Sequence, residues 1–127
     1  MKRYRKLMAG KKQILNNLTK APFPVNIKPM LATLSDKAFN SKEWIFEIKW
    51  DGYRVISKKS KNSVSLTSRN LTSFDKLFPS ISRSIKNIKG DFVIDGEAVA
   101  LDENNRPSFQ QIQNYRKTGK GNVVYYV

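Results

Sequence analysis

The stretch WIFEIKWDGYRVIS, residues 44–57, decides the expected fold. Apolar and charged residues alternate along its first half, a pattern that predicts a β-strand with Glu47 and Lys49 on its polar side. Asp51-Gly52 is typical of a tight turn between strands. We therefore expect residues 53–57 to return as a second, antiparallel strand.

Downstream, the sequence predicts three strands, at 63–68, at 91–101 with a break at Asp95-Gly96, and at 123–127. It also predicts two short helices, from Pro79 to Lys89-Gly90 and from Ser108 to about Tyr115. A basic loop at 116–121 follows the second helix. The first helix is predicted from the spacing of Ile81, Ile85 and Ile88, which would share one helical face. The second begins with a capping box formed by Ser108 and Gln111. Four aromatic residues are expected in the core rather than on a stacking surface: Trp44, Phe46, Trp50 and Tyr53. The fold class is α+β, an antiparallel-rich sheet with short flanking helices.

Charge divides the chain into two parts. Residues 1–35 carry eight Lys/Arg and no Asp/Glu, and the whole chain of 127 residues has a formal net charge of +14. We interpret residues 1–20 as a basic arm or linker and residues 21–127 as one domain. Prolines in residues 21–33 favour an extended strap along that domain. The positive charge favours nucleic acid as a partner, although a solvated lysine-rich surface explains it equally well.

The composition excludes several classes of chemistry. Histidine and cysteine are absent, so there is no Ser-His-Asp triad, no thiolate nucleophile and no imidazole or thiolate metal ligand. Catalysis must use lysine, arginine, carboxylates and hydroxyls. No apolar run approaches the roughly 20 residues of a membrane span. We expect a cytoplasmic protein that does not contact a membrane.

Lys49 is the strongest candidate nucleophile. Its amine has an ordinary pKa of about 10.4, so it needs burial or nearby cations to lose its proton at neutral pH. Arg54 and a metal-bound triphosphate are able to supply that effect, and Gly52 lets the backbone approach a ligand closely. On these grounds alone an exposed strand lysine remains the alternative.

A series of motifs narrows the choice. Lys49-x-Asp51-Gly52-x-Arg54 resembles motif I of the covalent nucleotidyltransferases, which include DNA ligases, RNA ligases and mRNA capping enzymes. Other matching segments follow the order of that family: Lys28-Pro29-Met30-Leu31-Ala32, Ser68-Arg69-Asn70 (motif Ia), Phe78-Pro79, Asp95-Gly96-Glu97 (motif III), Arg106-Pro107-Ser108-Phe109 and Gln113. Over residues 25–127 the set resembles the ligase domain of bacterial multifunctional end-joining ligases.

The resemblance implies a role for each matching residue. Lys49 would attack the α-phosphate of ATP and carry AMP, with Mg²⁺ or Mn²⁺ as the metal. Glu47 would lie in the segment that contacts adenine, and Arg54 would contact the ribose or the phosphates. Arg69 would bind the 5′-phosphate of the nick. Glu97 would hydrogen-bond the ribose hydroxyls and help to place the metal.

The same resemblance implies a fold and partners. The fold would be the first half of an ATP-grasp-like nucleotidyltransferase domain, and the substrate double-stranded DNA with nicks or breaks. A Ku-like end-binding protein is the implied partner, in the bacterial cytoplasm or nucleoid. Arg116, Lys117 and Lys120 form a basic group that would touch the DNA backbone, or only water.

The sequence departs from the family at its end. Residues 123–127 form an apolar run without a turn or cap, so we expect the sequence to be cut short. Relatives continue with motifs IIIa, IV and V and an OB-fold, and we expect the chain to be inactive in sealing without them. Two rival functions remain open: a capping-type guanylyltransferase, and a non-catalytic basic remnant that binds nucleic acid.

Overall fold

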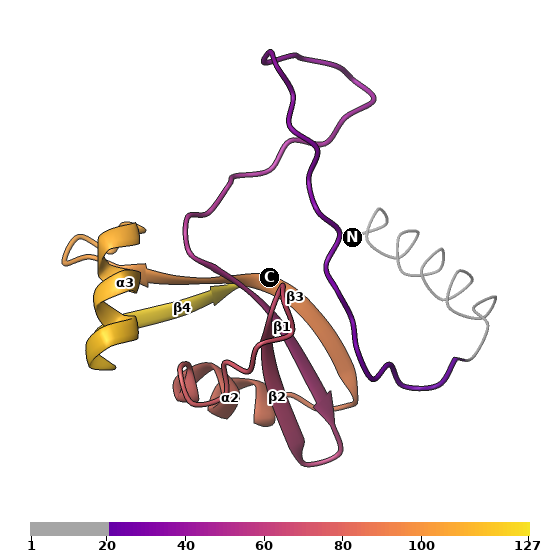
Figure 1. The fold of residues 1–127 in the computed structure, drawn as a ribbon, viewed down its shortest axis with the longest axis vertical. Coiled ribbons are helices and arrows are strands. Elements are labelled where there is room, and N and C mark those ends of the chain that lie inside the picture. Colours follow the sequence, from indigo (N-terminus) through magenta and orange to yellow (C-terminus); the bar gives the residue numbers. More distant parts are fainter. Residues whose placement is uncertain (1–20) are drawn as a thin grey trace, which may run out of the picture.

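The computed structural model describes residues 21–127, where it contains four strands and two helices (Figure 1). In chain order these are β1 (Tyr53–Ser60), β2 (Ser63–Ser68), α2 (Pro79–Lys86), β3 (Phe92–Leu101), α3 (Phe109–Thr118) and β4 (Asn122–Tyr126). The expected basic arm, residues 1–20, lies outside the described residues. Neither of the two helices is long and apolar enough to cross a membrane.

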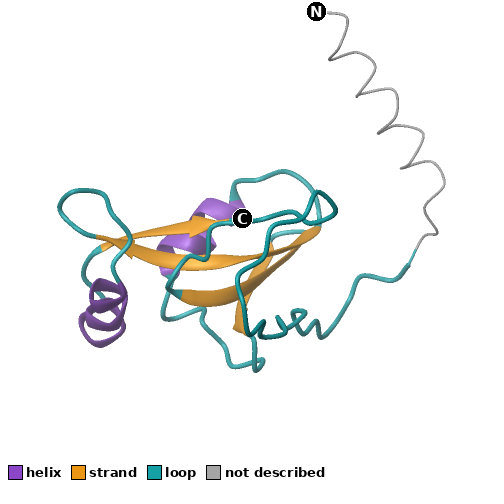
Figure 2. Ribbon diagram, turned by 90° about the horizontal axis from the view of Figure 1, so that it is seen from above, coloured by secondary structure: helices purple, strands orange, loops and turns teal. Residues whose placement is uncertain are grey.

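The four strands form one twisted antiparallel sheet in the order β2-β1-β3-β4 (Figure 2). β1 and β3 are the central pair, with Arg54 opposite Glu97. Glu97 is in turn opposite Tyr126 on β4. The predicted α+β class, with an antiparallel sheet and short helices, is confirmed.

Both helices pack on one face of the sheet and form the core there. The core joins alternate strand residues to the apolar sides of the helices: Val55, Leu66, Ala98 and Ala100 from the strands, Phe78, which precedes α2, and Ile81, Ile85, Ile112 and Tyr115 from the helices. The rings of Phe78 and Tyr115 stack with centroids 5.8 Å apart, which brings the start of α2 close to the end of α3. Because side chains alternate along a strand, the residues between these core positions point to the opposite face.

The two helices begin as predicted but end elsewhere. α2 has Pro79 in its first turn and ends at Lys86, before the predicted Lys89-Gly90 stop, so Ile88 lies beyond the helix and is exposed rather than buried. In α3 the hydroxyl of Ser108 accepts a hydrogen bond from the backbone N–H of Gln111, which confirms the predicted cap.

The end of α3 corrects the predicted basic loop. The helix continues to Thr118, so Arg116 and Lys117 belong to its last turn. Gly119 ends the helix in the left-handed conformation, with φ of 69°, where its N–H bonds the carbonyl of Tyr115. Glycine adopts this conformation without the steric penalty of a side chain.

The predicted strand at residues 44–50 is wrong. No strand of residues 21–127 forms a hydrogen-bonded pair with this segment, so its alternating pattern does not produce a strand. Trp44 and Phe46 are 62% and 58% exposed, and both pack on Phe39 instead of on the core. Of the four aromatic residues expected in the core, Tyr53 packs against it.

The predicted break at Asp95-Gly96 is also wrong, because β3 runs unbroken from Phe92 to Leu101. Gly96 has a different purpose. A Cβ atom at this position would lie 2.2 Å from the carbonyl oxygen of Tyr126 and 2.8 Å from the ring of Tyr125. The glycine therefore allows β4 to approach β3 closely rather than interrupting the strand.

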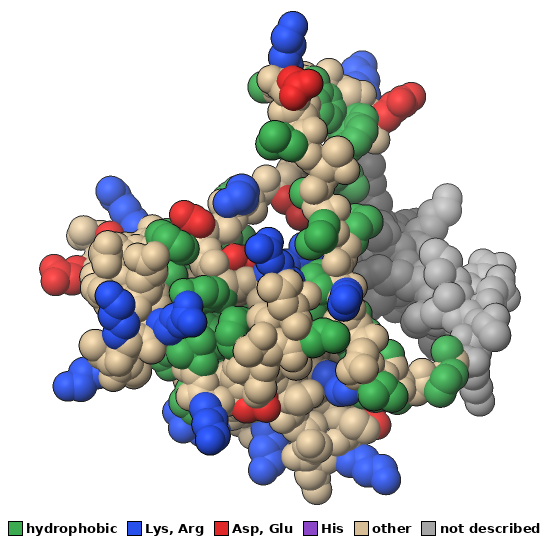
Figure 3. Space-filling view, viewed as in Figure 1, with side chains coloured by type: hydrophobic (Ala, Val, Ile, Leu, Met, Phe, Trp, Pro, Cys, Tyr) green, Lys and Arg blue, Asp and Glu red, His purple; other side chains and the backbone are tan. Residues whose placement is uncertain are grey.

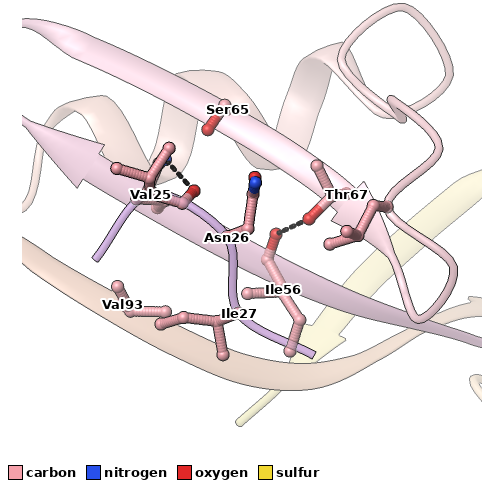
Figure 4. Close-up of a pocket in the computed structure, with 9 residues that line it drawn as sticks. Val25, Asn26, Ile27, Ile56, Ser65, Thr67 and Val93 are labelled. Carbon is pink, nitrogen blue, oxygen red and sulfur yellow. Dashed lines mark hydrogen bonds between the residues drawn. The ribbon is translucent and has the colours of Figure 1, made fainter. Parts of the chain in front are cut away.

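The proline-rich segment forms the expected extended strap, which lies against the sheet face that the helices leave open. The ammonium of Lys58 donates a 2.7 Å hydrogen bond to the carbonyl of Val25. Figure 4 shows Val25, Asn26 and Ile27 crossing over Ile56 and its neighbours on the sheet. The strap therefore covers one end of this face and leaves the other end open.

Candidate active site

A cavity of about 810 Å³ opens on the uncovered part of this face. Its size falls within the range typical of small-molecule sites. The strap, the segment before β1, and strands β1, β3 and β4 all line it, through Ala32, Glu47, Ile48, Lys49, Trp50, Arg54, Asp95, Gly96, Glu97, Tyr126 and Val127. We call it the Lys49 pocket.

Lys49 lies on the rim of this pocket, in the irregular segment that leads into β1. Its side chain is 88% exposed, and its ammonium is 3.9 Å from the carboxylate of Asp51. Gly52 then carries the chain tightly onto β3, where a Cβ atom would meet the carbonyl oxygen of Ala98 at 2.2 Å. Only glycine lets the chain pass this close, so Gly52 holds the end of the segment that carries Lys49 against β3.

Arg54 and Asp95 form the strongest polar contact of the pocket. The guanidinium donates two hydrogen bonds to the carboxylate, of 3.0 Å from Nε and 2.6 Å from Nη2. A third, of 2.7 Å, goes from Nη1 to the carbonyl of Met30 in the strap. The hydrogen bonds to Asp95 raise the pKa of Arg54 further. This guanidinium thus joins three segments that are distant in sequence.

Glu97 points into the pocket from β3, opposite Arg54. Its partial burial raises the pKa of the carboxyl above the ordinary value, against the lowering effect of the Gly52 N–H and the positive charges of Lys49 and Arg54. The carboxylate therefore faces the only two cations that line the pocket among the described residues.

Two aromatic rings form one wall of the pocket. Trp50 and Tyr126 stack in parallel, with centroids 4.1 Å apart and an interplanar angle of 6°. On the other face of β4, the hydroxyl of Tyr125 donates to the carbonyl of Val55 at 2.8 Å and lies 3.2 Å from the hydroxyl of Ser57. Two consecutive residues of β4 therefore serve different sides of the sheet: Tyr126 lines the pocket and Tyr125 packs against the core. Burial raises the pKa of the Tyr125 hydroxyl.

The structure brings together part of the predicted site. Glu47, Lys49, Arg54 and Glu97 all line the Lys49 pocket. Arg69 lies outside it, in an exposed turn after β2 where the hydroxyl of Ser68 accepts the N–H groups of Asn70 and Thr72. The basic residues at the end of α3 and after it also lie outside: Arg116, Lys117 and Lys120.

Two pocket residues, Trp50 and Tyr126, were not predicted as site members, and Asp95 was predicted only as part of the segment that resembles motif III. Asp95 carried a signal, because it precedes Glu97 by two positions and so shares its face of the strand. Trp50 and Tyr126 carried none, since their stacking depends on the pairing of β3 with β4.

The charges of the pocket determine which ligands it suits. Its lining contains three carboxylates, Glu47, Asp95 and Glu97, and two cations, Lys49 and Arg54. No group of three or more metal-ligating residues occurs in residues 21–127. Asp95 is paired with Arg54, which leaves Glu47 and Glu97 as carboxylates that fit a Mg²⁺ ion taking most of its ligands from phosphates and water. The arrangement suits a nucleotide that enters with its own divalent cation.

Comparison with known proteins gives a consistent result. Residues 29–125 match the family model of the ATP dependent DNA ligase domain. The multifunctional non-homologous end joining protein LigD of Pseudomonas aeruginosa is 36% identical over 109 residues, which are 85% of this chain and 13% of that protein. LigD of Mycolicibacterium smegmatis is 41% identical over 93 residues, 72% of this chain and 12% of that one. A DNA ligase of Methanococcus aeolicus is 41% identical over 92 residues, 68% of this chain and 16% of the relative.

Solved structures show the same fold. The ligase domain of M. tuberculosis LigD superposes with a TM-score of 0.54 at 33% identity, over 62% of this chain and 26% of that one. A mycobacterial DNA ligase D complexed with ATP and MES gives a TM-score of 0.55 at 32% identity, with the same coverage. The chain therefore spans about an eighth of the LigD relatives and a quarter of these solved chains.

Proposed function

This chain belongs to the ATP dependent DNA ligase domain family, and we propose that its Lys49 pocket is the part of that domain that carries AMP. The observation that supports the proposal is the convergence of Glu47, Lys49, Arg54 and Glu97 on one cavity. Three of them lie within residues 47–54, and Glu97 comes from β3. A solvent-exposed lysine without a function would not account for the other three side chains at the same cavity.

In the proposed reaction Lys49 is the nucleophile toward ATP. Its Nζ forms a P–N bond with the α-phosphorus, the bond between that phosphorus and the bridging oxygen breaks, and pyrophosphate leaves with the electron pair. The amine proton passes to solvent. The product is a lysyl-AMP phosphoramidate, from which AMP is transferred to the 5′-phosphate of DNA.

The surrounding residues position the nucleotide in this proposal. Glu47 and the ring of Trp50 border the side where the base would lie, and Glu97 accepts hydrogen bonds from the ribose hydroxyls. Arg54 acts by holding the strap and Asp95 in place, because its guanidinium already donates to both. This differs from the direct contact with ribose or phosphate that the resemblance implies.

A divalent cation is part of the proposal because the pocket lining carries one more negative charge than positive. Mg²⁺, or Mn²⁺, would neutralise phosphate charge as pyrophosphate leaves. Glu97 is the carboxylate that would hold it, since Asp95 is paired with Arg54 and Glu47 borders the side of the base in this proposal.

The proposed substrate of the whole protein is double-stranded DNA with nicks or breaks. Arg69 would bind the 5′-phosphate, and Arg116, Lys117 and Lys120 would contact the backbone. End joining with a Ku-like partner, in the bacterial cytoplasm or nucleoid, completes the proposal. It is supported by the LigD relatives, which are named for non-homologous end joining.

A long incubation with α-labelled ATP and Mg²⁺, followed by denaturation, tests the role of Lys49. We expect a covalent adenylyl group on Lys49, which is lost in Lys49→Arg and kept in Lys42→Arg. Lys42 is the matched control because it is exposed in the same irregular segment. Nucleotide bound to the pocket with label on another residue would reject Lys49 as the carrier.

The same experiment separates the two rivals. A capping-type guanylyltransferase would retain label from α-labelled GTP and not from ATP. A non-catalytic remnant would retain neither, and would bind DNA equally well after Lys49→Ala.

A further inference from the structure

Lys49 lies in a segment that gives its side chain little support. Residues 44–50 pair with no strand of residues 21–127, and each residue from 42 to 49 is exposed. The ammonium of Lys49 is 3.9 Å from the carboxylate of Asp51, whose side chain is itself 66% exposed. An exposed ion pair fixes its two groups only weakly, because water and salt screen it. The position of Lys49 in the pocket therefore depends on a neighbouring residue.

The loop before this segment stands away from the sheet. Figure 1 shows it at the top of the view, and Figure 3 shows hydrophobic side chains on its surface. Its aromatic rings pack on one another rather than on the core, since the ring centroid of Phe39 lies 5.1 Å from that of Trp44 and 5.7 Å from that of Phe46. We therefore looked for the residues that hold Lys49 on its other side, toward β1.

Trp50, the residue after Lys49, ties the segment to β4. It is half-buried, in contrast to residues 42–49. Its ring stacks in parallel on Tyr126, and their centroid distance of 4.1 Å is the shortest of the aromatic pairs found among residues 21–127. A stacked pair restricts both the separation and the tilt of its rings. The backbone from which the Lys49 side chain extends is therefore held next to β4.

The ring of Tyr126 is itself held by the sheet. Tyr126 is opposite Glu97 in the register of β3 with β4. Gly96 lets the two strands approach closely, since a Cβ atom there would meet the carbonyl oxygen of Tyr126 at 2.2 Å. The hydroxyl of Tyr125, the preceding residue, contacts one carbonyl on β1 and another on β3. The stack therefore relates the Lys49 segment to the strand that carries Glu97.

Gly52 does not make the stack redundant. It packs on the carbonyl oxygen of Ala98 and so holds the end of the segment on β3. Two residues, Trp50 and Asp51, separate it from Lys49, and each has two soft backbone torsions. Rotation about these torsions would move the ammonium of Lys49 across the pocket if the ring of Trp50 were not held.

We propose that Tyr126 is a positioning residue for the nucleophile: its ring holds Trp50, and Trp50 holds the backbone of Lys49 where its amine reaches the α-phosphate of ATP. This inference rests on the proposed function, because such positioning affects a rate only if Lys49 reacts. Attack requires the reacting atoms to lie about 3 to 3.5 Å apart and aligned, so a small displacement of Lys49 lowers the rate steeply. Tyr126 acts through Trp50 and needs no contact with ATP.

The initial rate of covalent labelling of the full chain by α-labelled ATP and Mg²⁺, measured over a range of ATP concentrations, tests the proposal. In Tyr126→Leu, which removes the ring, we expect the rate at saturating ATP to fall by on the order of ten-fold, and the half-saturating ATP concentration to stay within about two-fold. Tyr126→Phe keeps the stacked ring and should restore most of the rate. Phe39→Leu is the matched control, because it removes aromatic contacts from the loop before Lys49 and should change neither constant.

The two constants separate positioning from base binding. A change in the half-saturating concentration alone would overturn the proposal, because the rings would then be a surface for the base. An equally slow Tyr126→Phe would overturn it as well, because the hydroxyl rather than the stack would be responsible. Trp50→Leu should be as slow as Tyr126→Leu, and the double variant no slower than either, since the two rings act as one unit. Additive losses would contradict that coupling.

A second measurement does not depend on the reaction. The heteronuclear NOEs of the backbone amides of residues 48–51 should fall in Tyr126→Leu and stay at the wild-type values in Tyr126→Phe. Circular dichroism checks that each variant folds; if Tyr126→Leu does not, Trp50→Leu takes its place, because position 50 lies outside every strand and helix of residues 21–127. Lower NOEs in the variant without label on Lys49 of the wild type reject the proposed function alone. Label that forms at an unchanged rate in Tyr126→Leu rejects this inference alone.

Discussion

The guanidinium of Arg54 binds the carboxylate of Asp95 through two parallel hydrogen bonds, which join β1 to β3 at the edge of the Lys49 pocket. Asp95→Asn should weaken this pair and free the strap, which Arg54 also holds through Met30. Because the pair is partly exposed, we expect a loss of about 1 kcal/mol in unfolding free energy by urea titration. Proteolysis within residues 21–34 should become faster. Asp36→Asn, which removes the same charge from the exposed segment after the strap, should change neither measurement.

The hydroxyl of Tyr125 should contribute to the stability of the fold. Its hydroxyl contacts the carbonyls of Val55 and Ile94 and the hydroxyl of Ser57. Tyr125→Phe leaves these buried groups without that partner and should cost about 1 to 2 kcal/mol of unfolding free energy. Tyr126→Phe is the matched control, because it keeps the ring that stacks on Trp50. An equal loss in both variants would contradict the prediction.

Glu97 should make stability depend on pH. Burial raises its pKa above the ordinary 4.5. A carboxyl with a raised folded-state pKa contributes stability that is fully present below the unfolded value and is lost as the pH rises through the folded-state value. Glu97→Gln should therefore gain up to about 1 kcal/mol over the wild type at pH 7, since the group is only partly buried and solvent screens it. The gain should disappear near pH 4.

Thermal or urea unfolding at both pH values measures this difference. The matched control is Glu103→Gln, which makes the same charge change in the exposed turn before α3. The same pH-dependent gain in both variants would show that net charge, rather than the pocket, is responsible.

ATP binding should require a divalent cation. The pocket lining has two cations, and the guanidinium of Arg54 is already bonded to Asp95 and Met30. With EDTA we expect the affinity for ATP to fall by on the order of ten-fold, because phosphate charge is then not neutralised. Quenching of Trp50 fluorescence reports the binding. Adenosine, which has no phosphates, is the control ligand and should bind equally with and without EDTA.

The 127-residue chain should show almost no nick sealing. Lys49 is 88% exposed, so the described residues do not enclose it, and the chain covers 26% of the solved ligase chains. A gel assay with a nicked duplex, ATP and Mg²⁺ measures the product. Closure at a rate comparable to that of a complete ligase would contradict this expectation.

The sequence predicted local features well. Ser108 and Gln111 located the start of α3, and the spacing of Ile81 and Ile85 located α2. Both signals depend on neighbours within one helical turn. Two motifs, the one around Lys49 and the one that contains Glu97, also contributed residues to a single pocket: Glu47, Lys49, Arg54 and Glu97.

Contacts between residues far apart in the chain could not be predicted from the local sequence in the same way. Residues 44–50 have the pattern of a strand, but a strand exists only beside a partner, and the described residues provide none. The bond of Arg54 to Asp95 spans 41 positions and depends on the register of β1 with β3. Nothing in either local sequence indicates that the guanidinium is occupied.

The extended segment before β1 has a practical consequence for handling the protein. Ile45 and Ile48 are 89% and 72% exposed, next to backbone groups that pair with no strand of residues 21–127. Such an edge invites association between molecules. The net charge of +14 opposes it by mutual repulsion, which salt screens. Solubility should therefore decline as ionic strength rises, the reverse of ordinary salting-in.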